Sequence, residues 1–290
     1  MLRLSRTIAV TESTRAIECL AKAVPELSKS RLKDAMSKGA VYLMKGRKQQ
    51  RLRRAQTTLQ SGQCLQLYYD EQIMQRRAEP AELLLDMRGY SVWWKPAGLL
   101  AQGSQWGDHL SLLRQVELTT GRPVFLVHRL DREASGLMMV AHHAKSAAAL
   151  SQQFSGSEMT KHYLVQVAGQ LPAARLREGS IQQSLDGKAS HTRFQLIHYD
   201  EAMQRSWLQV ELLSGRKHQI RRHFAAIGHP VMGDPRYGNS SSSSDGLALQ
   251  AVLLGWQCPQ SKQLKTVSLP EHLKIYSSAG NAGASISSCN

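Results

Sequence analysis

The sequence predicts an α+β protein in which a small N-terminal α/β domain precedes a larger domain with a mixed, mostly antiparallel sheet. Two observations predict the larger domain: from about residue 89 onward short alternating apolar segments follow one another, and few helical segments separate them. The small domain is predicted because residues 14–75 combine helical periodicity with short strands. The predicted division is residues 1–75 for the small domain, 76–88 for a polar linker, 89–275 for the larger domain and 276–290 for a disordered tail.

The small domain opens with two helical patterns. Apolar residues spaced i, i+3, i+4 and i+7 over residues 17–24 predict a first helix, which Pro25 ends. Ser28 is expected to cap a second helix, and Gly39 is expected to close it. Two strands are predicted to follow: residues 40–44 and residues 63–68.

Basic residues gather in the second predicted helix and in the segment RKQQRLRRAQ, residues 47–56. A surface of this kind is suited to following a phosphate backbone, although a solvated charged face is the alternative interpretation. We predict that the small domain binds RNA through these basic residues: Lys29, Arg31, Lys33, Arg47, Lys48, Arg51, Arg53 and Arg54.

The larger domain is predicted to combine strands with three helices. The first helix is expected to start at an Asp108 cap and to end at Gly121, the second to span residues 144–154, and the third to begin after Gly215. The serine-rich residues 239–245 predict a flexible loop. The strands are predicted at residues 90–94, 123–127, 136–141, 162–167 and 207–213.

The charge balance of the 290 residues points to a polyanionic partner, because 37 basic and 22 acidic residues give a net charge of +15. A membrane surface is the alternative partner. However, the apolar run of residues 247–256 is too short to span a bilayer, and the apolar residues 8–10 are too few for a secretory signal. We therefore expect RNA, and no membrane, as the partner.

The four cysteines are scattered along the chain without a CxxC pair. This pattern argues against a disulfide framework and against a zinc ribbon, and it favours a reducing compartment. We therefore expect a cytoplasmic protein, and we expect it to be a monomer.

The stretch LVHRLDREASGLMMVAHH, residues 126–143, places charged side chains between two apolar runs. Asp131 lies between Arg129 and Arg132, and nearby cations favour a carboxylate over the neutral acid. A carboxylate in a half-buried loop is able to act as a nucleophile or as a base. The alternative is an ion pair that only holds the loop, and we keep this interpretation for Arg132 and Glu133.

A second stretch, residues 212–238, combines cations and histidines around a predicted helix. A cap at Ser214 would put Arg216 and Lys217 in the first helical turn, where cations oppose the helix dipole, so a bound phosphate or carboxylate is expected there. The histidine spacing does not match a zinc motif, and Ser135 lacks a GxSxG context. We therefore expect neither a metal site nor a serine hydrolase.

These stretches resemble a known family, the RluA-type RNA pseudouridine synthases. HRLDREASGLMMVA, residues 128–141, resembles the family signature HRLDxxTSGLLLxA. GRKHQIRRHFAAIGHPVMGDPRYG, residues 215–238, resembles GRTHQIRxHxxxxGHPIxGDxxYG. Residues 94–99 and 161–165 are similar to the NKPAGL and KxYxAxV segments, and residues 14–75 resemble the S4-like RNA-binding domain of many members.

This sequence departs from the family pattern at a few positions. Trp94 stands where Asn is usual, Ala134 where Thr is usual, and Lys217 where Thr is usual. A tract of serines, residues 240–244, follows the last motif. None of these departures removes a catalytic residue type of the family, and Lys217 and the serine tract are candidates for influencing which RNA is chosen.

The resemblance implies a pseudouridine synthase fold and the isomerisation of uridine to pseudouridine in RNA, without a cofactor and without a metal. Asp131 would be the essential aspartate, acting either as the nucleophile at the sugar or as the group that removes its 2′-hydrogen. Arg129 would hold the flipped nucleotide, Tyr163 would stack on the uracil, and Arg221 would pair with Asp131. The other residues implied to contact the substrate are His128, Arg216, Lys217, His218 and Gln219.

The expected substrate is large-subunit (23S) ribosomal RNA, because an S4-like domain is commoner among family members that modify it. A tRNA-directed enzyme is the first alternative, and an inactive RNA-binding or ribosome-associated protein on the same fold is the second. An aspartate-dependent hydrolase of small molecules is the third, and it would need a second carboxylate or a metal cluster near Asp131.

Overall fold

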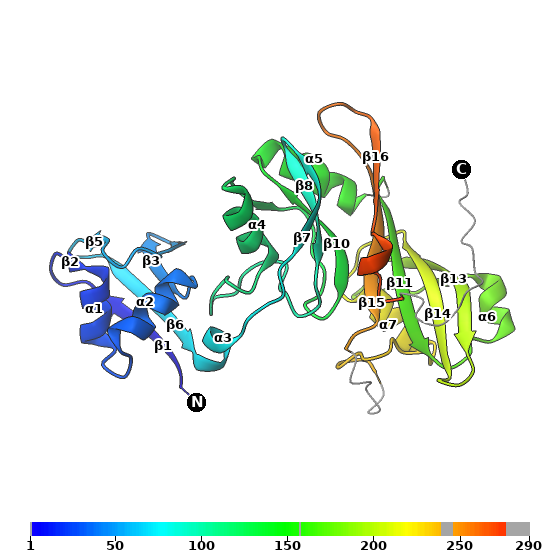
Figure 1. The fold of residues 1–290 in the computed structure, drawn as a ribbon, viewed down its shortest axis with the longest axis horizontal. Coiled ribbons are helices and arrows are strands. Elements are labelled where there is room, and N and C mark those ends of the chain that lie inside the picture. Colours follow the sequence, from blue (N-terminus) through cyan, green and yellow to red (C-terminus); the bar gives the residue numbers. More distant parts are fainter. Residues whose placement is uncertain (1, 157, 239–245, 277–290) are drawn as a thin grey trace. The chain divides into compact units, whose positions relative to one another are not determined.

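The computed structural model describes residues 2–156, 158–238 and 246–276, and the chain divides into two compact units. The small unit contains residues 1–80 and 99–122, and the large unit contains residues 81–98 and 123–290 (Figure 1). The predicted division did not separate residues 99–122 from the larger domain. The serine tract and the predicted tail beyond Tyr276 lie outside the described residues.

Residues 99–122 group with the small unit because Asp108 binds it through several contacts. Its carboxylate forms ion pairs with Arg51 at 3.2 Å and with Arg53, and its backbone N–H donates to the Lys38 carbonyl at 2.9 Å. The sequence pattern predicted a cap role for Asp108, but Ser111 caps this helix instead, accepting from Arg114 N at 3.4 Å. Asp108 does not cap the helix because α4 begins at Leu112, four residues further along the chain, and Ser111 directly precedes it.

The small unit contains a four-stranded antiparallel sheet in the order β1-β6-β3-β4. The alternating burial of β6 places Leu65, Leu67 and Tyr69 in the core, which the predicted strand at residues 63–68 anticipated. The elements of this unit are β1 (Arg3–Ala9), β2 (Thr14–Arg15), α1 (Ala16–Ala23), α2 (Lys29–Ser37), β3 (Val41–Lys45), β4 (Lys48–Arg51), β5 (Thr58–Leu59), β6 (Cys64–Asp70), α3 (Glu71–Gln75) and α4 (Leu112–Thr120).

Helix α2 begins and ends as its sequence predicts. The Ser28 hydroxyl accepts a hydrogen bond from Arg31 N at 3.3 Å, and Gly39 follows with a φ of 77°. Leu32, Ala35 and Met36 are spaced to lie on one face and are fully buried in the core of the unit. Because this face is buried, the basic residues of α2 are left on the exposed side.

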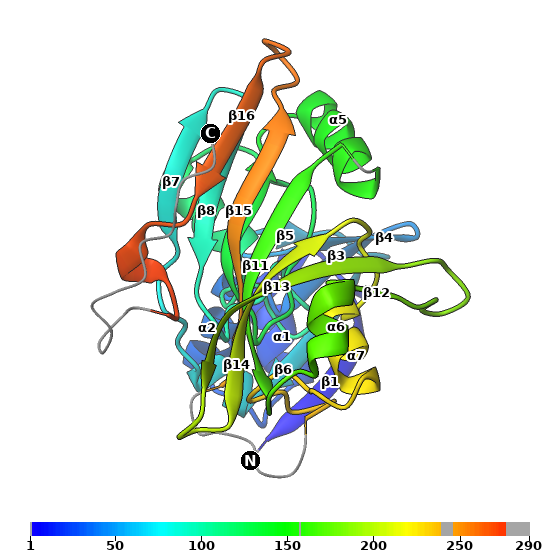
Figure 2. The same cartoon turned by 90° about the vertical axis from the view of Figure 1, so that its right-hand side faces the viewer.

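The large unit, within the described residues, contains one sheet of ten strands, and its path runs β12-β13-β14-β11-β15-β10-β8-β7 (Figure 2). Its strand pairs are antiparallel except β10 with β15, so the predicted mixed, mostly antiparallel sheet is confirmed. The strands are β7 (Glu82–Met87), β8 (Tyr90–Lys95), β9 (Phe125–Leu126), β10 (Ser135–Ala141), β11 (Thr160–Ala168), β12 (Ser180–Gln182), β13 (His191–Asp200), β14 (Arg205–Leu212), β15 (Leu249–Gln257) and β16 (Leu264–Ser268).

Strand β7 lies inside the segment that was predicted as a linker, residues 76–88. It pairs with β8 and stands at the end of the sheet path, so among the described strands one of its sides has no neighbour. Most of its residues are exposed or half-buried, and Glu82 and Asp86 face solvent. The strand itself is mostly apolar (ELLLDM), but Arg76, Arg77, Glu79 and Arg88 flank it, and these charged neighbours explain the difference from the predicted boundary.

The parallel contact between β10 and β15 depends on a glycine. Gly136 has a φ of 112°, and a Cβ atom at this position would lie 2.2 Å from the Ala251 carbonyl oxygen. Ser135 and Gly136 pair with Gln250 and Ala251, and every residue of β10 is buried. The loop that precedes β10 is thereby held at a fixed place on the sheet.

The helices of the large unit are α5 (Ala144–Ser155), α6 (Ala173–Glu178), α7 (Gln219–Ala226) and a short 3-10 turn, Glu271–Leu273. Helix α5 was predicted, but α7 begins later than expected, because His218 and not Ser214 precedes its first residue. The Ser214 hydroxyl instead donates to Gln219 Oε1 at 2.9 Å and accepts from His191 N. Arg216 and Lys217 therefore lie outside the first turn, contrary to the prediction.

No helix in residues 2–156, 158–238 or 246–276 combines the length and the hydrophobicity that a membrane span requires.

Candidate active site

A pocket of about 530 Å³ lies in the large unit, between the loop that joins β9 to β10 and the start of α7. Asp131 comes from that loop, Tyr163 from β11 and Arg221 from α7. The pocket brings together all the catalytic and substrate-contacting residues that the sequence predicted: His128, Arg129, Asp131, Tyr163, Arg216, Lys217, His218, Gln219 and Arg221.

Arg221 connects two aspartates in this pocket. Its Nε and Nη2 donate to the two carboxylate oxygens of Asp234 at 2.7 and 2.8 Å, and its Nη1 donates to Asp131 Oδ2 at 2.8 Å. The side chains of Arg221 and Asp234 are 3% and 0% exposed, whereas that of Asp131 is 22% exposed. Asp234 therefore fixes the orientation of the guanidinium on the buried side. The guanidinium in turn holds Asp131, whose carboxylate remains partly exposed to the pocket.

The ionisation of the Arg221–Asp234 pair follows from these contacts. Burial by itself lowers the pKa of Arg221, but the hydrogen bonds to Asp234 and Asp131 outweigh it and raise the pKa. Burial raises the pKa of Asp234, but hydrogen bonds from Arg221 and from the backbone N–H groups of Arg236 and Tyr237 lower it overall. Both side chains of the pair are thus charged.

Tyr163 contributes a buried, protonated phenol to the pocket. In the pairing of β11 with β15 the register shifts between His162 and Tyr163, because His162 pairs with Leu253 and Tyr163 with Ala251, which leaves Val252 of β15 without a partner residue opposite. Burial, and then the charge of Asp131, raises the pKa of Tyr163. Its hydroxyl is therefore a hydrogen-bond donor, and its ring offers an apolar surface on which a base can stack.

His128 forms part of the pocket wall. Its ring stacks on Phe154 with centroids 3.8 Å apart, and its Nε2 accepts a hydrogen bond from Met139 N at 2.9 Å. Burial, and then the nearby cation of Lys161, lowers the pKa of His128 to about 3. The imidazole is neutral with its proton on Nδ1, and it binds the loop to β10.

Three cations of the pocket are exposed. Arg216 Nε donates to the Ala189 carbonyl at 3.2 Å, while Lys217 and Arg129 extend into solvent. Among the described residues, Arg129 and Lys217 have no ion pair with a carboxylate. These charges are available to an anionic ligand at the pocket mouth.

Gln219 lines the pocket but has no free hydrogen-bonding group. Its Nε2 donates to the His191 carbonyl and to Thr192 Oγ1, both at 3.0 Å, and its Oε1 accepts from Ser214 Oγ and Arg216 N. The residue is 2% exposed. Its geometry is that of a support for the turn before α7, and not that of a residue that touches a ligand.

Two residues in contact with the predicted site residues, Asp234 and Tyr237, were not predicted as site residues. Both lie in the GDPRYG turn of the second motif, and Tyr237 OH lies 3.0 Å from His218 Nδ1. Asp234 could have been found from the sequence, because a buried arginine that binds a catalytic carboxylate requires a second acceptor for its remaining nitrogens.

The predicted ion pair between Arg132 and Glu133 is not formed in the part of the chain that the structure describes. The Arg132 side chain is exposed, and its carbonyl accepts hydrogen bonds from Gly98 N at 2.7 Å and from Lys95 Nζ at 3.3 Å. Lys95 is fully buried, and burial lowers its pKa to about 8 in spite of the charges of Glu133 and Asp131. Hydrogen bonds to the Arg132 carbonyl from Gly98 N and from the Lys95 side chain, and not the predicted pair, hold this part of the loop.

The predicted RNA-binding cations of the small unit fall into two groups. Lys29 pairs with Glu18 at 2.6 Å and Arg31 with Glu71 at 3.0 Å, while Arg51 and Arg53 share Asp108. The other four are exposed and have no carboxylate partner among the described residues: Lys33, Arg47, Lys48 and Arg54.

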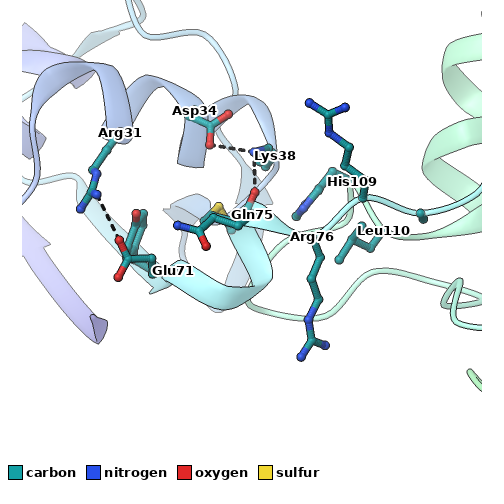
Figure 3. A pocket seen from close by; sticks show the side chains of 12 residues that line it. Arg31, Asp34, Lys38, Glu71, Gln75, Arg76, His109 and Leu110 are labelled. Atoms are coloured by element: carbon teal, nitrogen blue, oxygen red, sulfur yellow. Dashed lines mark hydrogen bonds and ion pairs between the residues drawn. The ribbon is translucent and has the colours of Figure 1, made fainter. Parts of the chain in front are cut away.

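A pocket of about 650 Å³ in the small unit contains the Arg31–Glu71 pair (Figure 3). It also contains a pair between Lys38 and Asp34 at 2.8 Å. These cations and carboxylates bind one another, so the pocket has mixed charge, and its arginine, Arg31, has a side chain that is 51% exposed, in contrast to the buried Arg221 of the large unit.

The chain is similar in sequence to a family of known proteins. A model of the RNA pseudouridylate synthase family matches residues 89–226. An uncharacterized RNA pseudouridine synthase of Chloroflexus aurantiacus is 30% identical over 95% of this chain and 94% of its own length. The ribosomal large subunit pseudouridine synthase D of Xanthomonas campestris is 29% identical over 82% of this chain and 76% of its own.

Two further comparisons concern coverage and fold. An uncharacterized RNA pseudouridine synthase of Mycoplasma genitalium is 33% identical over 57% of each chain, so this chain spans little more than half the length of that relative. The structure of human RNA pseudouridylate synthase domain containing protein 1 has a TM-score of 0.53 at 23% identity, over 66% of this chain and 83% of that one. This likeness concerns the fold.

Proposed function

Because this chain belongs to the RNA pseudouridine synthase family, we propose that it converts specific uridines of large-subunit ribosomal RNA into pseudouridine. The reaction is an isomerisation in which the glycosidic C–N bond breaks, the uracil rotates, and a C–C bond forms to the same sugar carbon. The similarity to the Xanthomonas large-subunit enzyme supports this class of RNA target.

One observation carries the proposal: Asp131 meets Arg221 at 2.8 Å in the pocket that also contains Tyr163. A carboxylate held by a buried arginine, and open to the pocket on its other side, is oriented for chemistry at a sugar. Asp131 acts either as the nucleophile at the sugar or as the base that removes its 2′-hydrogen.

The uridine must leave its stack to reach Asp131, and unstacking costs a few kcal/mol that the pocket has to offset. The Tyr163 ring replaces part of the lost stacking, since it is an apolar surface beside the carboxylate. Arg129, exposed at the pocket and without a carboxylate partner among the described residues, binds the phosphate of the displaced nucleotide or fills the space it vacates.

The small unit contributes affinity for the RNA backbone as an S4-like domain. The four cations without carboxylate partners, Lys33, Arg47, Lys48 and Arg54, are the first candidates for phosphate contacts. The paired cations Lys29 and Arg31 would have to exchange a carboxylate for a phosphate, so each of their contacts gains less.

The proposal is tested by mapping pseudouridines in total RNA from cells with and without the gene. The deletion strain is expected to lose a pseudouridine in large-subunit ribosomal RNA, and the wild-type gene is expected to restore it. Asp131→Asn is expected to restore nothing, because the amide is neither a nucleophile nor a base. Glu133→Gln, which neutralises a carboxylate two residues away in the same loop, is the matched control and is expected to restore the site.

Each other outcome overturns a part of the proposal. A pseudouridine lost from a tRNA would replace the target with the first alternative. No lost site, together with no product from the purified protein on total RNA, would make the chain an inactive RNA-binding protein on this fold. Full restoration by Asp131→Asn would remove Asp131 from the reaction.

A further inference from the structure

His218 has a left-handed backbone conformation, which is uncommon for residues other than glycine. Its φ is 54° and its ψ is 31°, in the left-handed region, immediately before the first residue of α7. Among residues other than glycine, histidine is one of those that adopt it more often, and the conformation persists where the surrounding structure enforces it. The conformation places the imidazole between Asp131 and Tyr237.

The two ring nitrogens of His218 face groups of different kinds. Nε2 lies 3.4 Å from Asp131 Oδ1, and Nδ1 lies 3.0 Å from the Tyr237 hydroxyl. A carboxylate oxygen only accepts hydrogen bonds, whereas a phenol can also donate one. The neutral imidazole therefore satisfies both neighbours in one tautomer, in which Nε2 carries the proton and Nδ1 accepts from Tyr237.

The surroundings of His218 favour this neutral form. Burial lowers the pKa of His218, and the nearby cations Arg221, Lys217 and Arg236 lower it further, while only Asp131 raises it. Tyr237 itself is held by the same cations, since the guanidinium carbons of Arg221 and Arg236 lie 5.3 and 5.5 Å from its ring centroid. The hydroxyl that faces Nδ1 is thus kept in place.

We propose that His218 and Tyr237 are positioning residues for Asp131. The Tyr237 hydroxyl fixes the tautomer of the His218 imidazole, and the Nε2–H group of that imidazole orients carboxylate oxygen Oδ1 of Asp131. Arg221 holds the other oxygen, Oδ2. The distance of 3.4 Å is long for a hydrogen bond, and contacts of this kind often shorten when substrate binds. His218 therefore acts through Asp131, and not by binding the RNA as its motif position suggested.

The tautomer can be measured without catalysis, by long-range proton–nitrogen NMR on the full-length protein labelled with 15N-histidine. The His218 signals are identified by their loss in His218→Gln. The wild type is expected to show the Nε2–H tautomer, and Tyr237→Phe, which removes the donor to Nδ1, is expected to show both tautomers. An unchanged His218 spectrum in Tyr237→Phe would overturn the proposal, whether or not the proposed RNA activity is correct.

The kinetic test rests on the proposed function. It uses unmodified RNA that contains the uridine which the enzyme converts. Tyr237→Phe is expected to lower kcat at least about tenfold with KM unchanged, because the carboxylate is less well oriented but RNA contacts remain. His218→Gln places an amide N–H near the position of Nε2 and is expected to recover most of the activity that His218→Ala loses. A rise in KM with kcat unchanged would instead assign His218 to RNA binding.

The pH profile separates positioning from a merely structural role. In the wild type, protonation of His218 in acid adds a cation beside Asp131 and weakens it as a nucleophile or base. His218→Gln cannot be protonated, so the acid limb of its kcat profile is expected to move to lower pH. His198→Gln, at an exposed site on β13, is the matched control and is expected to keep the wild-type profile. Identical acid limbs for the wild type and His218→Gln would contradict the proposal.

Discussion

Helix α7 carries two neighbouring arginines that each bind an aspartate through two nitrogens, one pair buried and the other exposed. Arg221 holds Asp234 through two nitrogens at 2.7 and 2.8 Å, and Arg222 holds Asp186 through two nitrogens at 2.9 and 3.0 Å. The first pair is 3% and 0% exposed, whereas the second is 25% and 70% exposed. The donor atoms also differ: Arg221 binds Asp234 through Nε and Nη2, which leaves Nη1 for Asp131, whereas Arg222 binds Asp186 through Nη1 and Nη2.

The two pairs differ in whether water can solvate a charged side chain when its partner is lost. Water can solvate Arg222 or Asp186 if the pair opens, so the exposed pair contributes little to stability. Arg221 and Asp234 have no such replacement, because breaking a buried pair leaves an unpaired charge inside the protein. Only the buried arginine is therefore fixed in orientation, and only it has a third nitrogen directed at Asp131.

The largest expected effect is on stability, and it follows from removing the carboxylate that binds the buried arginine. Asp234→Asn is expected to lower the free energy of unfolding by about 3 kcal/mol, because Arg221 loses its buried counter-charge. Chemical denaturation of the purified protein measures this difference. Asp186→Asn is the control on the outer face of α7 and is expected to unfold at the wild-type denaturant concentration. Equal losses in the two variants would contradict the comparison.

The second effect is on catalysis and concerns the shape of the cation. Arg221→Lys keeps the charge but cannot bind Asp234 through two nitrogens while it also reaches Asp131, and we expect kcat/KM to fall about 100-fold. Arg222→Lys is expected to keep the wild-type value. Single-turnover pseudouridine formation measures both variants, and an active Arg221→Lys enzyme would mean that charge alone is sufficient.

A third prediction extends the comparison to a half-buried base, His128. Burial holds the pKa of His128 at about 3, while in the unfolded chain the group titrates near its ordinary value of 6.5. Between these values the unfolded state binds the additional proton, so stability falls as the pH falls, by at most about 1.4 kcal/mol per pH unit from this group.

His128→Gln is expected to lose this part of the pH dependence, and denaturation at pH 7 and pH 5 measures it. His198→Gln, at an exposed position, is expected to keep the wild-type dependence. If His128→Gln and the wild type lose the same free energy on acidification, His128 takes up its proton in the folded state at an ordinary pH.

The smallest effect per residue concerns the exposed cations of the small unit. Replacing Lys33, Arg47, Lys48 and Arg54 by Gln is expected to weaken RNA binding and to reduce the slope of log K against log salt by up to about 0.9 per phosphate contact. The value of kcat is expected to stay unchanged. Replacing the paired Lys29 and Arg31 is expected to change the slope less per residue. Equal changes per residue would mean that the pairs open on binding RNA.

The helices that could be predicted from the sequence are those whose caps and apolar periodicity agree. Helix α2, with Ser28 before it and Gly39 after it, is an example. Helix α7 begins later than predicted because the Ser214 hydroxyl does not cap it. The hydroxyl instead forms hydrogen bonds with Gln219 Oε1 and with His191 N. Strand β7 was missed because its short apolar segment, ELLLDM, lies between charged residues that made the whole of residues 76–88 look like a linker.

The site residues that could be predicted from the sequence are those at fixed positions of the two motifs. The residues that were missed are those that support a site residue through a side-chain contact. The contact of Arg221 with Asp131, 90 residues apart, was expected from the family resemblance and is present at 2.8 Å. Asp234 and Tyr237 were not expected, because the sequence does not show which side of the GDPRYG turn faces the pocket. The left-handed conformation of His218 is also invisible in a pattern of residue types.

The contact of Gly136 with Ala251 has a consequence for the order in which the protein assembles during synthesis. The two residues are joined by a parallel pairing across 115 positions of the chain, and pairings over such separations form late. Strand β15 leaves the ribosome well after the loop that carries Asp131, so this loop is without its sheet support until most of the chain has been made. Translation that stops before β15 would therefore release a protein with an unsupported aspartate, and catalytic competence would be gained only near the end of synthesis.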